Sequence, residues 1–280
     1  MEKERLDLLV VQQGLTDSRE KAKRLIMAGQ IYDENNQRYD KPGEKISVEK
    51  TLHIKGETLK YVSRGGLKLE KAIALFQVNP KDKIFLDIGS STGGFTDVAL
   101  QNGAKLCYAL DVGYNQLDWK LRQDERVEVM ERVNFRYSKL EDFEKGRPEM
   151  ASIDVSFISL KLILPVLKEI IAVGGDVVAL IKPKFEAGRG KIGKKGIVSD
   201  PAVHNEVLRD ILEFASLTGF DVKNLSFSPI TGGTGNIEFL VHLEANDHAP
   251  GIISPEIDSQ QVVKEAYLQL KSKSISISDK

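Results

Sequence analysis

Three polar residues stand where apolar segments of the sequence are predicted to form strands. Asp154 and Lys182 each follow an apolar run, and Glu238 lies inside a later one. Ligands of open α/β sheets bind at the carboxyl ends of the strands, so side chains at these places are candidates for chemistry. A fourth candidate, Lys68, stands at the start of a predicted helix. Such ammonium and carboxylate groups could remove a proton from a poor nucleophile, provided that burial or a neighbouring cation lowers the pKa of one lysine.

Each of these residues also has an ordinary structural interpretation. Lys68 could be an exposed lysine of its helix, and Glu238 could lie on the outer face of an edge strand. Asp154 could cap the next helix, and Lys182 could mark the point where a strand meets water. Taken singly, none of the four defines a site.

The segment DIGSSTGGFT, residues 87–96, is the strongest single feature of the sequence. It follows a buried strand and opens a helix, which is the context in which a glycine-rich turn binds a ligand. Gly89 permits a tight turn, while Gly93 and Gly94 let the helix begin beneath a ligand. The spacing is not GxGxxG and no Gly-Lys-Ser/Thr follows, so a dinucleotide site and a P-loop are both disfavoured.

Asp111 ends the next predicted strand, 24 residues after Asp87. A carboxylate there can accept hydrogen bonds from both ribose hydroxyls of an adenosyl group. A glycine turn that only makes room for packing is the alternative, and the position of Asp111 favours the ligand site.

Strand–helix alternation begins at about Leu67. Helices are predicted over residues 95–103, 159–172 and 201–219, and strands over residues 83–89, 106–112, 150–157, 174–183 and 236–244. This alternation predicts an α/β fold with an open, doubly wound, mainly parallel sheet. Residues 251–280 are expected to form a tail that is helical in part and disordered in part.

The first sixty residues form a separate small unit. Helical spacing of apolar residues is followed by Ser18, a plausible N-cap, and by a helix with four basic residues in six positions, 19–24. Short β-type segments then alternate with turn-rich stretches. A solvated helix face would explain the basic cluster taken alone.

Composition sets further limits. The chain has 280 residues, 41% of them hydrophobic and 29% charged, and a formal net charge of −1, so any affinity for nucleic acid must come from local basic patches. The single cysteine, Cys107, excludes an internal disulfide and a multi-cysteine metal site, and the four histidines show no ligand spacing, so no metal is expected. The sequence shows neither a membrane span nor a signal-peptide core, and a cytoplasmic location is expected.

Residues 5–46 closely resemble the small RNA-binding module named after the fourth protein of the small ribosomal subunit. The resemblance rests on the Arg-Leu-Asp start, the Ser-Arg opening of the helix, the following Ala-Gly and a short hairpin. It implies that residues 1–60 are an α+β RNA-binding domain with an alpha-L motif. The RNA contacts it implies are Arg5, Arg19, Lys23 and Arg24, which agrees with the role of cations in positioning RNA.

The string DIGSSTGGFTD resembles the cofactor loop of ribose methyltransferases of the FtsJ type. That resemblance implies S-adenosyl-L-methionine as cofactor and the Lys-Asp-Lys-Glu tetrad of these enzymes at Lys68, Asp154, Lys182 and Glu238. The cofactor contacts it implies are Asp87, Gly89, Ser90, Ser91, Thr92, Gly93, Gly94, Phe95, Asp111, Val112 and Asn134.

The strings YVSRGGLKL, IDVSFISL, LIKPKFE, KGIVSD and GNIEFL narrow the resemblance to the TlyA family of ribosomal RNA methyltransferases, also labelled hemolysins. The family implies a Rossmann-like, seven-stranded methyltransferase domain over residues 67–250, joined by a linker at 61–66. The expected reaction is transfer of a methyl group to a ribose 2′-hydroxyl, of cytidine in ribosomal RNA or ribosomal subunits, by a monomer. A basic stretch after Lys182 and the junction add four expected RNA contacts: Arg64, Lys184, Arg189 and Lys191.

Other functions stay open at this point. A membrane-active hemolysin would need an apolar or strongly amphipathic segment that the sequence lacks. A noncatalytic RNA-binding assembly factor would keep the fold, and a methyltransferase for proteins or small molecules would leave the N-terminal module unexplained. Amino-methylating enzymes usually carry Asp/Asn-Pro-Pro-aromatic where this chain has Asp154-Val-Ser-Phe157, and Cys107 lies in a predicted buried strand, away from the crevice.

Overall fold

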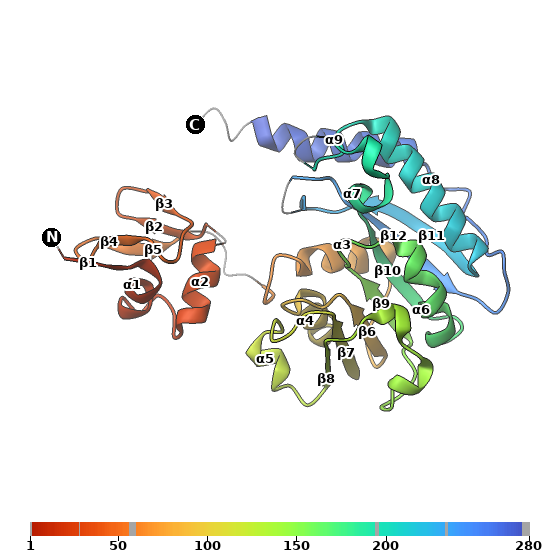
Figure 1. The fold of residues 1–280 in the computed structure, drawn as a ribbon, viewed down its shortest axis with the longest axis horizontal. Helices are drawn as coiled ribbons and strands as arrows, with labels where there is room; N and C mark the ends of the chain where they lie inside the picture. Colours follow the sequence, from red (N-terminus) through yellow and green to blue (C-terminus); the bar gives the residue numbers. More distant parts are fainter. Residues whose placement is uncertain (1, 28, 56–59, 194–195, 233–234, 276–280) are drawn as a thin grey trace. The chain divides into compact units, whose positions relative to one another are not determined.

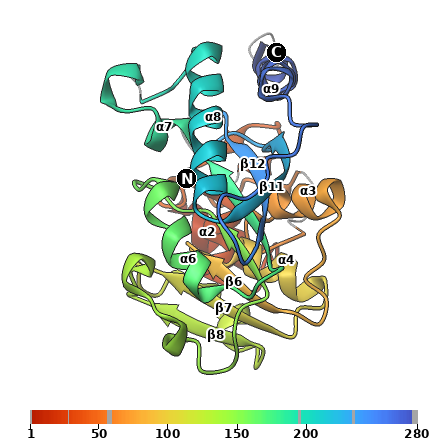
Figure 2. The ribbon, with the colours of Figure 1, turned by 90° about the vertical axis from the view of Figure 1, so that its right-hand side faces the viewer.

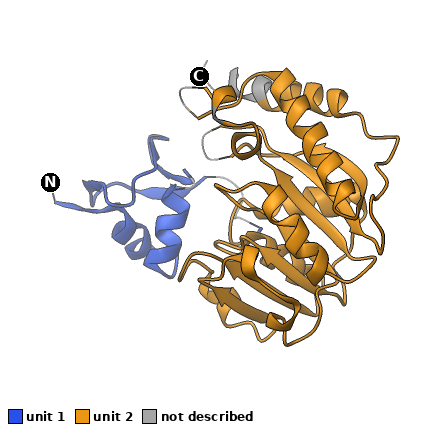
Figure 3. Ribbon diagram, turned by 45° about the vertical axis from the view of Figure 1, so that its right-hand side comes forward, with its two compact units in different colours: residues 1–60 blue, residues 61–280 orange. Residues whose placement is uncertain are grey.

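The computed structural model describes residues 2–27, 29–55, 60–193, 196–232 and 235–275, without the side chains of Arg189 and of residues 271–275. The chain forms two compact units, residues 1–60 and 61–280 (Figure 1, Figure 3). The side chain of Tyr61 is buried in a core of the second unit. Residues 61–66, expected as a linker, therefore belong to the second unit.

The first unit packs two helices against short strands. Its elements are β1 (Lys3–Arg5), α1 (Leu6–Gln12), α2 (Arg19–Met27), β2 (Ile31–Asp33), β3 (Arg38–Tyr39), β4 (Lys45–Ser47) and β5 (Leu52–Ile54). Strand β1 pairs with β4, and β2 lies between β3 and β5. Leu6, Ala22, Ile26 and Ile31 are fully buried between these layers. Ser18 accepts a hydrogen bond from the backbone N–H of Lys21 at the start of α2, as expected of an N-cap.

The second unit is built on a seven-stranded sheet of order β11-β12-β10-β9-β6-β7-β8 (Figure 1). Strands β10, β9, β6, β7 and β8 are mutually parallel, and β12 runs antiparallel to both β10 and β11. The predicted doubly wound, mainly parallel sheet is confirmed. Its strands are β6 (Ile84–Ile88), β7 (Leu106–Asp111), β8 (Val127–Glu131), β9 (Met150–Ile153), β10 (Asp176–Ile181), β11 (Phe220–Phe227) and β12 (Phe239–Ala245).

Helices cover both faces of this sheet. Figure 2 shows α3 and α4 on one side of the strands and α6 and α8 on the other. The helices are α3 (Gly66–Phe76), α4 (Gly94–Gln101), α5 (Trp119–Arg122), α6 (Leu164–Ile170), α7 (Pro183–Glu186), α8 (Pro201–Leu217) and α9 (Ser259–Ile275). Single 3₁₀ turns occur at η1 (Phe135–Tyr137), η2 (Leu140–Asp142), η3 (Leu160–Leu162) and η4 (Arg189–Lys191).

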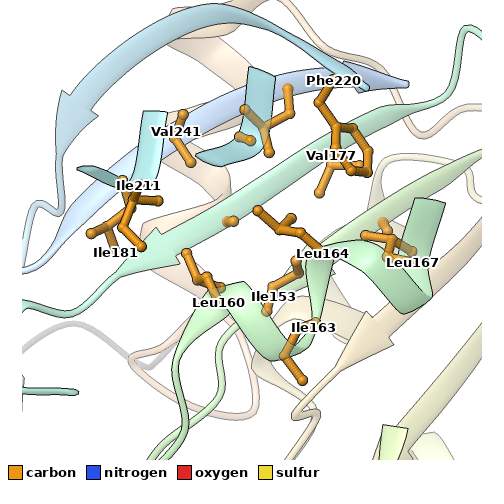
Figure 4. Packing of buried hydrophobic residues seen from close by; sticks show 14 of the residues in the cluster. Ile153, Leu160, Ile163, Leu164, Leu167, Val177, Ile181, Ile211, Phe220 and Val241 are labelled. Atoms are coloured by element: carbon orange, nitrogen blue, oxygen red, sulfur yellow. The ribbon is translucent and has the colours of Figure 1, made fainter. Parts of the chain in front are cut away.

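The continuous apolar run of β10 follows from burial on both faces. Val177 and Ile181 point into the core formed with α6 and α8, where Figure 4 shows them near Leu164 and Ile211. Leu180, one residue from Ile181, points into the opposite core with α3 and α4. Successive side chains of a strand alternate between faces, so a strand covered on both sides has a nearly continuous apolar sequence.

The C-terminal segment does not form a tail throughout. Helix α9 packs on α8 and β11, and its Val263 and Ala266 are buried in the core on that face. The expected helix is therefore present and integrated into the second unit, while residues 276–280 lie outside the described residues.

Candidate active site

Strand direction brings three of the predicted polar residues to one edge of the sheet. Strands β9 and β10 are parallel, so Asp154 and Lys182, which follow them directly, leave the sheet on the same side. Strand β12 is antiparallel to β10 and its first residue, Phe239, pairs with Ile181. The sequence had indicated that Glu238 lies inside a strand, but Glu238 immediately precedes β12. An antiparallel strand begins where its parallel neighbours end, so Glu238 reaches the same edge.

The fourth residue, Lys68, comes from the first turn of α3 and completes a connected cluster. Lys68 Nζ donates to Glu238 Oε2 over 2.7 Å and to Asp154 Oδ2 over 3.2 Å. Lys182 Nζ forms an ion pair with the other oxygen of the same carboxylate, Asp154 Oδ1. Lys68, Lys182 and Glu238 are only 7%, 9% and 6% exposed. The interpretation of Lys68 as an exposed helix lysine is therefore wrong.

Mutual attraction keeps Lys68 and Asp154 charged. Burial lowers the pKa of Lys68, but Asp154 and Glu238 outweigh it, so that pKa lies above its ordinary value. Burial raises the pKa of Asp154, but Lys182 and Lys68 outweigh it, so that pKa lies below its ordinary value. Lys68 is thus a fixed cation and Asp154 a fixed anion at neutral pH.

The glycine-rich loop approaches this cluster closely. Gly89 has a φ of 86°, and a Cβ there would lie 2.6 Å from the backbone oxygen of Asp154. Gly93 has a φ of 91°, and a Cβ there would lie 2.2 Å from Leu121 Cδ1. Both positions need glycine, because a side chain would collide and the left-handed backbone favours glycine.

Asp87 supports this loop from below. Its Oδ2 accepts hydrogen bonds from Thr96 N over 3.0 Å and from Thr96 Oγ1 over 2.7 Å, and its Oδ1 accepts one from Ser152 Oγ over 3.1 Å. Burial raises the pKa of Asp87 to about 7 despite these hydrogen bonds. The carboxylate, expected as a cofactor contact, holds the start of α4 and also lines a cavity beside the loop.

A cavity of about 630 Å³ lies between the loop and the charged cluster. All four cluster residues line it, together with Gly89, Ser90, Ser91, Thr92, Gly94 and Phe95 of the loop and Arg64. Phe95 is only 4% exposed and packs mainly into the core. The predicted catalytic residues and several predicted cofactor-binding residues therefore line the same cavity.

A second cavity of about 340 Å³ lies on the other side of Gly89 and contains Asp111, Val112 and Asn134. Asp111 accepts hydrogen bonds from Ser91 N over 2.8 Å and from Gly113 N over 2.7 Å, which fixes its carboxylate. Val112 is 70% exposed, and the remaining walls are mainly apolar, with Phe135, Val155 and Ile163. A mainly apolar slot whose walls also carry the carboxylates of Asp111 and Asp154 and the amides of Gln116 and Asn134 fits a nucleoside. The adenosyl part of S-adenosylmethionine has this chemistry.

The expected RNA-contacting residues are spread over both units. In the first unit, Arg5 and Arg19 both donate to the buried carboxylate of Asp7, and Lys23 forms an ion pair with Glu20. Arg24 is half-buried in α2.

In the second unit, Arg64 is exposed and Lys184 is half-buried in α7. Lys191 forms an ion pair with Glu206 of α8. The side chain of Arg189 and residues Lys194 and Lys195 of the basic stretch lie outside what the structure describes.

Ser156 and Phe157, which follow shortly after Asp154, were not predicted as site residues. Ser156 lines both cavities, and Lys182 Nζ donates to its Oγ over 3.3 Å. Phe157 follows with a φ of 66° and 87% exposure, and its ring lies 5.2 Å from that of Phe185. Their position just past the carboxyl end of a strand is the sequence signal that could have indicated both.

Other chemistries find little support among the described residues. Cys107 is fully buried in β7, and burial raises the pKa of its thiol. Within the described ranges, no three His, Cys, Asp or Glu side chains gather in a way that could hold a metal ion. No described helix has both the length and the apolar character needed to cross a membrane.

Comparison with known proteins adds independent information. The family model for FtsJ-like methyltransferases matches residues 61–245. The Bacillus subtilis protein YqxC, whose assignment as an rRNA methyltransferase is provisional, is 61% identical over 276 residues and the match covers 98% of each chain. The 16S/23S rRNA (cytidine-2′-O)-methyltransferase TlyA of Mycobacterium tuberculosis is 38% identical over 240 residues, with 85% of this chain and 89% of TlyA covered.

A solved structure from Streptococcus thermophilus, described as a hemolysin, is 56% identical and superimposes with a TM-score of 0.78, covering 98% of this chain and 99% of the other. The FtsJ-like match begins at the residue where the second unit begins, and it contains the charged cluster, the glycine-rich loop and both cavities. The chain therefore belongs to the FtsJ-like methyltransferases and, within them, to the TlyA family.

Proposed function

We propose that this chain transfers the methyl group of S-adenosylmethionine to the 2′-hydroxyl of a cytidine ribose in ribosomal RNA. The observation that carries the proposal is the contact of Lys68, Asp154, Lys182 and Glu238 beside the glycine-rich loop. The activity for which Mycobacterium tuberculosis TlyA is named, rRNA (cytidine-2′-O)-methylation, supports cytidine and ribosomal RNA as the substrate class.

The donor fits the second cavity and the rim of the first. Asp111 would accept hydrogen bonds from the ribose hydroxyls, Asn134 and Val112 would contact the adenine, and Gly89 would let the methionine part approach the backbone. The bound donor supplies a methyl group on a sulfonium. Residues 89–94 would hold that group between the two cavities and next to the charged cluster.

The cluster would prepare the attacking oxygen. A ribose hydroxyl is a poor nucleophile, and it reacts only if it is aligned with the methyl group and can lose its proton. Lys182 is the candidate base or orienting group. Asp154 holds Lys182 and Lys68 through its two oxygens, and Glu238 holds Lys68 from the other side.

The first unit would bind the RNA. Arg5, Arg19, Lys23 and Arg24 place cations on one small α+β unit, which suits the shape- and phosphate-based recognition of structured RNA. Arg64, at the mouth of the first cavity, and Lys184 would add contacts near the methylated nucleotide. A ribosomal substrate would place the protein in the cytoplasm, and we propose that it acts there as a monomer.

Other activities explain fewer features. A membrane-active hemolysin would make no use of the charged cluster or the cavities. A noncatalytic assembly factor would not need two buried lysines held by two carboxylates, which are costly to maintain without a function.

The direct test is methyl transfer from radiolabelled donor to naked rRNA, to isolated subunits and to whole ribosomes, followed by mapping of the label. We expect a labelled 2′-O-methylcytidine that is absent when Lys182→Ala replaces the wild type. Binding of S-adenosylmethionine without transfer to any RNA would instead favour the noncatalytic factor. Unchanged turnover of Lys182→Ala would remove that lysine from the mechanism.

A further inference from the structure

A neutral hydroxyl lies beside the ammonium group of Lys182. Lys182 Nζ donates to Ser156 Oγ over 3.3 Å and also pairs with Asp154 Oδ1. Ser156 is two residues beyond Asp154 on the segment that leaves β9, and it lines both cavities. We infer that Ser156 is a positioning residue that aims the Lys182 nitrogen at the substrate hydroxyl. This inference rests on the proposed function and assigns one more residue to the same site.

The geometry of an amine nitrogen determines where its lone pair points. A lysine nitrogen has three directions besides its own carbon, and in the neutral form two carry N–H groups and the third a lone pair. Asp154 and Ser156 offer oxygen acceptors in two of these directions. The lone pair must then take the third direction. Because Lys182 lines the first cavity, that direction is available to a hydroxyl bound there.

Comparison with Lys68 shows why a hydroxyl suits proton transfer by Lys182 better than a second carboxylate would. Lys68 donates to two carboxylates, and the attraction of both keeps its pKa above the ordinary value despite burial. A hydroxyl beside Lys182 fixes the direction of an N–H without adding a second negative charge that would hold a proton on the nitrogen. The two lysines are thereby suited to different tasks, Lys68 to charge and Lys182 to proton transfer.

The test compares Ser156→Ala, which removes the acceptor, with Ser156→Thr, which keeps a hydroxyl. Ser254→Ala serves as control, because Ser254 lies beside Val222 at the other end of β11 from Phe227. Single-turnover methyl transfer is measured with the full chain at saturating S-adenosylmethionine and rRNA. We expect Ser156→Ala to react about 10- to 100-fold more slowly, since small misplacements of a reacting group cost about 100-fold. Ser156→Thr should recover most of the rate, and Ser254→Ala should match the wild type.

Two further measurements separate positioning from a merely structural role. The affinity for S-adenosylhomocysteine and the melting temperature of Ser156→Ala should equal those of the wild type. A misaimed nitrogen also stays misaimed at every pH, so the rate deficit should persist from pH 6 to pH 9. The charged groups around Lys182 are its cluster partners Lys68, Asp154 and Glu238, and all three are unchanged in the variant. Asp87, which is buried beside the cluster and has a pKa of about 7, is also unchanged.

Three results would overturn the assignment: a wild-type rate for Ser156→Ala, a deficit that disappears at another pH, or a deficit explained by weaker binding of S-adenosylhomocysteine. The last would place Ser156 in the donor pocket. A wild-type protein that methylates no RNA would remove the proposed function itself, and the role of Ser156 with it.

Discussion

Lys68 Nζ and Glu238 Oε2 lie 2.7 Å apart although 170 residues separate them in the chain. This contact joins the first helix of the second unit, α3, to the start of its last strand, β12. Both side chains are almost fully buried, so their charges depend on each other and on Asp154 for compensation. Removal of either side chain would therefore leave a buried charge without compensation.

Replacement of Lys68 by methionine tests this dependence. The variant leaves the Glu238 carboxylate buried without its cation, and the expected loss in free energy of unfolding is about 3 kcal/mol. Lys161→Met is the matched control, because Lys161 pairs with Asp210 on the surface and the expected loss is below about 1 kcal/mol. Urea unfolding gives both values. Equal losses in the two variants would show that Glu238 does not depend on Lys68 for compensation of its charge.

Gly89→Ala should abolish binding of the methyl donor. The added Cβ would lie 2.6 Å from the backbone oxygen of Asp154, which cannot move without displacing the charged cluster. Gly174→Ala is the control, because Gly174 also has a positive φ, 77°, but nothing lies within 4 Å of the added atom. Calorimetry with S-adenosylhomocysteine should detect binding to Gly174→Ala only. Normal binding to Gly89→Ala would show that the loop is not the donor site.

Stability should depend on pH through Asp87. Burial raises its pKa to about 7, whereas an unfolded aspartate has a pKa of about 3.9. The folded chain then keeps a proton that the unfolded chain has lost, so the contribution of Asp87 to stability is full below about pH 4 and falls as the pH rises through 7.

Asp87→Asn keeps the shape of the side chain and stays neutral. Its free energy of unfolding, measured in urea, should therefore rise relative to that of the wild type between pH 5 and pH 8. Parallel curves for the two proteins would exclude a raised pKa for Asp87.

Asp7 should link the stability of the first unit to RNA binding. Hydrogen bonds from Arg5 and Arg19 lower the pKa of Asp7 to about 2, so its contribution is present above about pH 4 and is lost as the pH falls toward 2. Asp7→Asn should weaken binding of rRNA about tenfold, because both guanidinium groups lose the charge that holds them. Affinity for S-adenosylhomocysteine should not change. Filter binding and calorimetry measure the two affinities, and a parallel loss of both would indicate general unfolding.

Most of the fold could be predicted from the sequence, because the patterns that indicate its strands and turns are local. The apolar run of β10 and the glycine-rich turn after β6 identify themselves within ten residues. Strand β11 was not predicted, since it lies at the sheet edge and its sequence FDVKNLSF mixes polar and apolar residues without a clear period. Strands β1 and β3 are too short, at three and two residues, to show a period at all.

The site was harder to derive from residue patterns, because its members meet only through strand direction. Nothing local in the sequence indicates that Lys68 is buried, and its position in α3 is typical of an exposed lysine. The motif resemblance grouped it with Asp154, Lys182 and Glu238, and the structure brings the four together. Residue spacing does not predict which oxygen of Asp154 contacts which lysine. It also does not predict that Lys182 donates to the hydroxyl of Ser156, because both contacts depend on side-chain geometry.

Strand β12 enters the sheet between β10 and β11 and is the last strand in the chain. A shift of one residue in its pairing with β10 would turn Glu238 away from Lys68 and exchange the two faces of the strand. The four-residue charged cluster is therefore complete only when β12 is paired in this register with β10.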